Sequence, residues 1–116
     1  MEKSLVTPEE GHIFNCTVIE PDFPGDEDFK ALVLKVLPNE VFVLLEPLHF
    51  QKAMPRKFKA LKDLFANSDN VDSAMDEVFN ELSESLHDEI VIYDVKDGKY
   101  ETCLGFEIQF IEKMPA

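Results

Sequence analysis

The strongest constraint in the sequence is a turn signal that sets the pairing of two strands. Asp97-Gly98 separates the apolar-rich segments 89–96 and 99–112. A two-residue hairpin turn needs positive φ at its central positions, which Asp and Gly tolerate. This turn predicts three cross-strand pairs, Val95–Tyr100, Tyr93–Thr102 and Val91–Leu104. In that register one face carries Val91, Tyr93, Val95, Tyr100, Leu104, Phe106, Ile108 and Phe110, and a slip of one residue would expose them all.

A second predicted hairpin is apolar on both of its faces. Its strands, 30–37 and 41–46, are joined by the turn pair Pro38-Asn39. That turn predicts the pairs Val36–Val41, Leu34–Val43 and Leu32–Leu45. The opposite face is also apolar, and Lys35 is its only charged residue.

Two apolar faces are unusual, because an antiparallel sheet with one solvated face should alternate apolar and polar residues. Two helices cannot easily cover both faces of a five-stranded sheet. We therefore expect either a homodimer through the Ala31–Leu45 hairpin or a strongly curled sheet. Burial of ~500 Å² of such a surface would contribute on the order of 10 kcal/mol before opposing terms.

The remaining pattern predicts one further strand and two helices. Thr7-Pro8-Glu9-Glu10 has the signature of a single helical turn, and a strand at 12–20 and a loop at 20–29 follow it. The segment Pro47–Pro55 is expected to be a loop, followed by a helix at 56–66 and a second at 71–86. The second is capped by Asp69 or Asn70, with Val71, Met75, Val78, Phe79, Leu82 and Leu86 facing inward.

The predicted fold is a single α+β domain spanning residues 1–116. An antiparallel sheet of five to six strands carries two adjacent helices on one face, in the element order β-β-β-α-α-β-β.

The composition restricts the partners. The 116 residues contain 24 acids and 11 bases, for a net charge of −13, so the chain repels nucleic acid phosphates and anionic membranes. A charged partner would be basic, although such charge also serves solubility alone. The first residues lack the apolar run of a signal peptide, and no apolar stretch approaches the ~20 residues of a membrane span. With two cysteines, this favours a cytoplasmic chain with free thiols.

Acidic and basic residues are segregated along the chain. No Lys or Arg occurs between Lys62 and Lys96, whereas the second predicted helix carries Asp72, Asp76, Glu77, Glu81 and Glu84. Two pairs of these acids are four residues apart, a spacing that costs ~0.2–0.5 kcal/mol per pair. Five of the bases lie just before, at Lys52, Arg56, Lys57, Lys59 and Lys62. Either the two groups pair on the surface, or the acids are presented to a basic partner.

The loop after the first strand adds a second candidate partner-binding patch, made of Asp22, Asp26, Glu27 and Asp28. Phe23 and Phe29 are interleaved with these acids, which is typical of a docking loop. It is not a calcium loop, because Gly25 precedes the acidic run. A solvated surface loop is the alternative interpretation.

Catalytic signals are weak, and we expect no catalytic residue, metal or cofactor. His12 and Cys16 share a face of one strand but are separated by ~13 Å of extended chain, too far for a dyad. Cys16 is expected to be a buried thiol, and Cys103 lies near Glu101 and Glu107. These two glutamates could form a carboxylate pair, but nothing in the sequence places them together. His49 is the best single catalytic candidate.

The sequence therefore predicts a non-enzymatic acidic protein that binds and blocks a basic surface of a target protein. It would be an inhibitor of the immunity or anti-defence type, and a nucleic-acid mimic belongs to the same class. One alternative is a dimeric adaptor or chaperone for a specific partner, using the apolar hairpin. The other is a small-ligand-binding or enzymatic domain with a pocket near His49, Phe50 and Met54.

Overall fold

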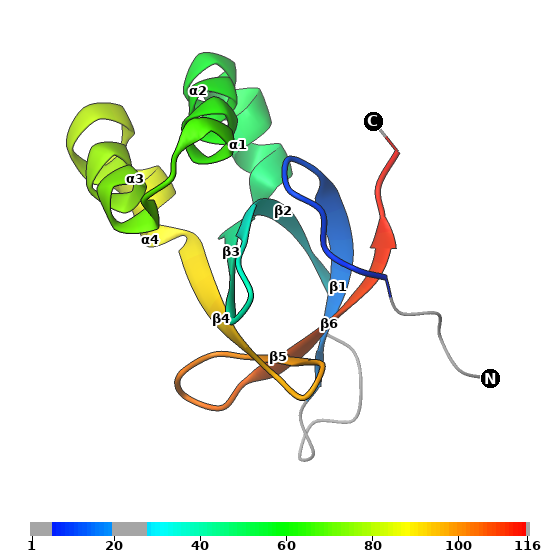
Figure 1. Cartoon of the computed structure of the whole chain (residues 1–116). Helices are drawn as coiled ribbons and strands as arrows, with labels where there is room; N and C mark the ends of the chain where they lie inside the picture. The colour runs from blue at the N-terminus through cyan, green and yellow to red at the C-terminus, as the bar shows by residue number, and fades with distance from the viewer. Residues whose placement is uncertain (1–5, 20–27, 116) are drawn as a thin grey trace.

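The computed structural model describes residues 6–19 and 28–115. Its strands form a closed antiparallel barrel in chain order, because β1 pairs with β6 as well as with β2 (Figure 1). The strands are β1 (Ile13–Ile19), β2 (Asp28–Val36), β3 (Glu40–Leu45), β4 (Ile90–Lys96), β5 (Lys99–Glu101) and β6 (Glu107–Lys113). The predicted α+β class is therefore confirmed. The sheet, however, closes into a barrel, and the element order contains one more strand and more helices than predicted.

The helices lie between β3 and β4 in the chain and pack outside one side of the barrel (Figure 1). They are α1 (Pro47–Ala53), α2 (Pro55–Asn67), α3 (Val71–Glu77), the π-helical turn η1 (Val78–Leu82) and α4 (Glu84–Asp88). The segment Pro47–Pro55 is thus not a loop. Pro47 and Pro55 each begin a helix, where a missing N–H costs nothing.

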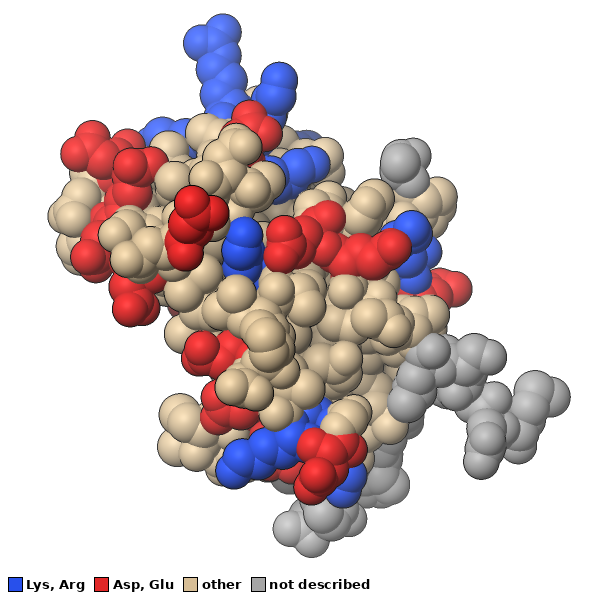
Figure 2. Space-filling view, in the orientation of Figure 1, with Lys and Arg blue, Asp and Glu red and all other residues tan. Residues whose placement is uncertain are grey.

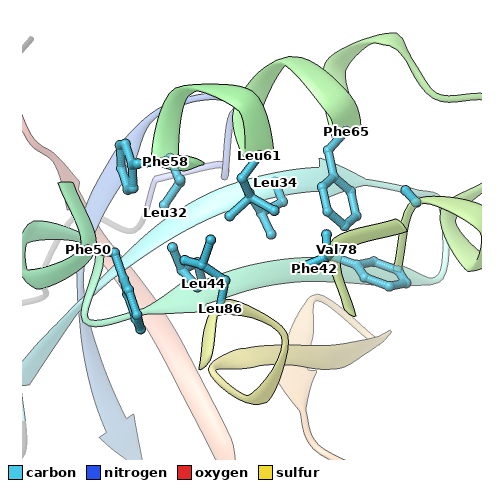
Figure 3. Packing of buried hydrophobic residues seen from close by; sticks show 11 residues of the cluster. Leu32, Leu34, Phe42, Leu44, Phe50, Phe58, Leu61, Phe65, Val78 and Leu86 are labelled. Atoms are coloured by element: carbon cyan, nitrogen blue, oxygen red, sulfur yellow. The ribbon is translucent and has the colours of Figure 1, made fainter. Parts of the chain in front are cut away.

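Barrel closure explains the hairpin with two apolar faces. Val41 and Val43 point into the barrel, where they pack with Phe14, Tyr93 and Phe110. Phe42 and Leu44 point outward and are covered by residues of the helices, as Figure 3 shows. Of the two alternatives, a homodimer or a strongly curled sheet, the structure contains the curled sheet. Because both faces of the Ala31–Leu45 hairpin are buried within one chain, the reason for expecting a homodimer through it disappears.

A β-bulge changes the register of this hairpin partway along. The pair Val36–Val41 is confirmed, but the strands then slip, so that both Leu34 and Lys35 oppose Phe42. Beyond the bulge the pairs are Val33–Val43, Leu32–Leu44 and Ala31–Leu45, and the predicted Leu34–Val43 and Leu32–Leu45 are wrong. The bulge places Leu34 and Lys35 together on the helical side. There the Lys35 ammonium donates to the carbonyl oxygens of Phe65 (3.4 Å) and Ser68 (3.2 Å) at the end of α2.

The C-terminal hairpin agrees with the prediction only next to its turn. Val95 pairs with Tyr100, and Asp97 and Gly98 both have positive φ. β5 ends at Glu101, so the predicted pairs Tyr93–Thr102 and Val91–Leu104 do not form. The Thr102 N–H instead donates to the Phe106 carbonyl, and Gly105, at φ 89°, closes a local turn. This turn exposes Leu104 (80%) and Phe106 (48%), which were predicted to be apolar core residues.

Two helical predictions also need correction. Residues 7–10 form no helical turn, and the chain bends instead at Glu10-Gly11 before entering β1. The helix predicted at 71–86 is interrupted at Ser83, whose backbone is extended (φ −169°) and whose hydroxyl accepts from the Leu86 N–H. Serine favours such local bonds over continued helix. Phe79, placed on the inner face by the helical period, lies in η1 and is 45% exposed.

Candidate functional site

The five acids predicted on the second helix form one exposed group, here called the helical acidic surface. They lie on α3, η1 and the first turn of α4, and each side chain is exposed: Asp72, Asp76, Glu77, Glu81 and Glu84. The residues that the sequence selected are therefore all exposed, although they lie on three short elements rather than one helix.

The buried residues of these elements fix the direction of the acids. Ala74, Val78 and Leu86 pack into the core against β2, β3 and α2, which turns the intervening carboxylates to solvent. Asn70, one of the two residues predicted for this role, caps α3 by accepting from the N–H groups of Asp72 (3.0 Å) and Ser73 (3.1 Å). The segment is thus held at its start and along its inner face.

In the described part of the chain, the basic residues of α1 and α2 form no ion pair within 4.0 Å with this surface. In residues 6–19 and 28–115 the ion pairs within 4.0 Å are Lys113–Glu9 and His87–Asp88, and neither involves the helical acidic surface. Figure 2 shows Asp and Glu gathered over the side of the helical layer where α3 and α4 lie. Lys and Arg project from the end formed by α1 and α2. Of the two interpretations of the segregated charges, surface pairing finds no support in these contacts.

Of the four acids in the second predicted patch, only Asp28 lies within the described residues. Asp22, Asp26 and Glu27 lie outside the described residues. Asp28 is exposed at the start of β2 and lines a cavity of about 550 Å³ with Lys30, Glu46, Glu89 and Tyr93. Burial raises the pKa of Tyr93, which also lines this cavity, to about 12. Sequence patterns could not indicate the cavity, because its walls come from segments far apart in the chain.

The barrel adds an acidic row that sequence reasoning missed. Four carboxylate residues are neighbours across β3, β4, β5 and β6, in the order Glu40, Asp94, Glu101 and Glu107. Their strand neighbours Val41, Tyr93, Tyr100 and Ile108 pack inside the barrel, so this acidic row lies on its outer surface. Glu101 and Glu107 are thus placed together, a pairing the sequence left open. The hairpin register could have revealed Asp94 opposite Glu101.

Replacing Glu101 with lysine should increase the free energy of unfolding. Like charges directly opposite on neighbouring strands are unfavourable, and opposite charges contribute ~0.2–1 kcal/mol per pair. In the Glu101→Lys variant the new ammonium group would meet Asp94 on one side and Glu107 on the other. Urea denaturation at low salt measures the gain, which should shrink at ~1 M salt because screening is then strong. Asp63→Lys, an exposed change on α2, is the control. A destabilised Glu101→Lys variant would contradict the proposed repulsion.

The weak catalytic candidates do not assemble into a site. His49 is exposed on α1 with its ring edge-on to Phe50 (centroids 5.2 Å apart), and Phe50 is buried in the core. Met54 lies at the junction of α1 and α2. Among the residues that the structure describes, no group of three or more His, Cys, Asp or Glu is arranged to hold a metal ion.

The two cysteines should differ sharply in reactivity. Cys16 is completely buried in the barrel, as predicted, and burial raises the pKa of its thiol to about 12. Cys103 is exposed in the turn after β5. Because the thiolate is the reactive form, a disulfide reagent at pH 8 should modify Cys103 in the native protein and Cys16 only on unfolding. Mass spectrometry of the two labelled peptides checks this, and equal labelling rates in the native state would contradict it.

Comparison with protein-family models finds no match, and searches of curated proteins and of solved structures find none either. Across residues 6–19 and 28–115, every helix is too short or too polar to cross a bilayer.

Proposed function

We propose that this protein binds a basic surface of another protein through its helical acidic surface and thereby blocks that surface. The observation that carries the proposal is the exposure of Asp72, Asp76, Glu77, Glu81 and Glu84 with no Lys or Arg within 4.0 Å among the described residues. Repelling carboxylates on adjacent elements reduce stability slightly, and a complementary basic surface would relieve that repulsion.

The type of partner follows from charge. A surface of this kind accelerates association with a basic protein and discriminates against acidic ones, more than it increases raw affinity. An inhibitor, an immunity protein or an anti-defence protein would work in this way by covering a functional cleft. If the cleft normally binds nucleic acid, the carboxylates take the place of phosphates and the protein competes with the nucleic acid.

The test is affinity capture with a double charge reversal, Glu77→Lys with Glu81→Lys. Losing two surface ion pairs worth up to about 1 kcal/mol each, and replacing them with repulsion, should lower partner affinity about tenfold or more. Wild-type capture should also fall between about 50 and about 500 mM salt, because screening weakens exposed charge pairs.

A matched control separates the surface from net charge. Asp63→Lys with Asp69→Lys makes the same change in net charge at exposed positions outside the helical acidic surface. This control should retain its partner. Equal loss in both variants, or capture that is insensitive to salt, would contradict the proposal. Duplex DNA that displaces the captured partner would assign it to the nucleic-acid-binding class.

A further inference from the structure

We propose that one cavity of the protein binds a small organic anion with an apolar body. This cavity lies between the helical layer, the start of β1 and the end of β6. The cavity measures about 440 Å³, within the range of small-molecule sites. Its walls come from α1, α2, β2, the start of β1 with the segment before it, and the segment after β6: Gly11, His12, Ile13, Leu32, Leu48, Gln51, Phe58, Lys62, Met114 and Pro115. We refer to it as the Lys62 cavity.

The apolar part of the lining can hold a hydrocarbon or aromatic body. Leu32 and Phe58, which lie next to each other in Figure 3, form buried wall, and Leu48 is an exposed large apolar residue at the rim. The Met114 N–H donates to the Ile13 carbonyl (2.8 Å), which fixes the C-terminal wall against β1. An apolar ligand that displaces water from these walls gains binding free energy in proportion to the area buried.

The polar part of the lining favours a negative charge. The Lys62 ammonium lies 5.7 Å from the centre of the Phe58 ring, one turn away on α2, and this contact holds it at the cavity. Lys62 makes no ion pair within 4.0 Å in the described part of the chain. His12 and Gln51 add groups that can donate hydrogen bonds, and the described lining contains no carboxylate side chain.

The two acids that directly precede Gly11 and His12 of the lining are engaged in other hydrogen bonds. Glu9 accepts from the Lys113 ammonium (2.8 Å), and this hydrogen bond together with the lysine charge holds the pKa of Glu9 below its ordinary value. Glu10 accepts from the Val36 N–H (2.9 Å). In a chain with a net charge of −13, the described lining of the Lys62 cavity therefore combines an apolar wall with an unpaired cation and no acidic side chain. This inference does not depend on the helical acidic surface.

The experiment titrates the full-length protein with octanoate and follows backbone amide chemical shifts by NMR. Saturable shifts should appear at the residues that line the Lys62 cavity. Octylammonium, which has the opposite charge, and octanol, which has none, should bind at least about tenfold more weakly, since one charge-assisted hydrogen bond corresponds to roughly a factor of ten. Absence of saturable octanoate shifts up to about 10 mM, a millimolar limit that corresponds to very weak affinity, would overturn the proposal.

Two lysine variants decide whether the charge acts locally. Lys62→Gln should weaken octanoate binding about tenfold, whereas Lys59→Gln, which removes an exposed charge from the same helix outside the cavity, should leave it unchanged. An equal effect of both variants, or octanol binding as tightly as octanoate, would show only an apolar crevice and overturn the proposal. Neither variant alters the helical acidic surface, so the capture experiment is unaffected by this result.

Discussion

Replacing Phe110 with alanine should lower the free energy of unfolding by about 3–5 kcal/mol, the usual cost of removing a buried phenyl ring. Phe110 is 1% exposed inside the barrel, where its ring meets Phe14 and Tyr100 edge-on at centroid distances of 5.7 and 5.0 Å. Its removal leaves a void between β1, β5 and β6 that the surrounding strands cannot fill. Thermal and urea denaturation followed by circular dichroism measure the change.

Phe106→Ala provides a matched control from the same part of the chain. Alternation along one strand would put Phe106 and Phe110 on the same face, but the turn at residues 102–106 exposes Phe106 by 48%. Its replacement should change stability by less than about 0.5–1 kcal/mol, as for most surface positions. Comparable losses in the two variants would show that β6 extends back through Phe106, and would contradict the observed end of β5.

Placing aspartate at either Val43 or Leu44 should prevent folding of the monomer. The two residues are adjacent on β3 and point in opposite directions, Val43 into the barrel and Leu44 beneath the helices, and both are completely buried. An unpaired carboxylate at either position loses its hydration without a partner, a cost that exceeds about 4 kcal/mol. Far-ultraviolet circular dichroism and proteolysis should report an unfolded chain.

If the aspartate variants do not fold, smaller substitutions on the same strand still allow the loss of stability to be measured. Leu44→Ala should cost about 2–5 kcal/mol, whereas Glu40→Asp at the start of the same strand should have little effect. Light scattering gives the oligomeric state of each variant. One outcome would contradict the prediction: the wild-type protein is a dimer, and the Leu44→Asp variant is a folded monomer. The outer face of β3 would then be an association surface.

Features that depend on neighbouring residues could be predicted from the sequence, but the closure of the barrel could not. The Asp97-Gly98 turn and the Val36–Val41 pair each depend on neighbouring residues, and each was predicted correctly. The α3 cap also depends on local sequence, and its prediction left a choice between Asp69 and Asn70. The bulge at Leu34 and the π-helical turn η1 depend on which face of each segment must meet the other elements. The turn register therefore placed Leu32 wrongly, and the helical period placed Phe79 wrongly. The meeting of β1 with β6 depends on the whole chain.

The same distinction holds for the candidate sites. The helical acidic surface could be predicted because its members lie within one short segment with no intervening base. The acidic row on the barrel and the Lys62 cavity could not, since their members come from three or more separate segments. The row was partly within reach, because the correct turn register already places Asp94 opposite Glu101.

The seam between the first and last strands has a consequence for how the molecule reaches its native state. The Asn15 amide donates to the Glu112 carboxylate across this seam (2.8 Å), and the two residues are 97 positions apart. Bringing such distant segments together costs chain entropy before the contacts between them can form. Closure of the barrel between β1 and β6 should therefore be a late and slow step of folding. On the ribosome, β1 must wait for β6 to emerge, and until then its unpaired edge remains open to pairing with other molecules.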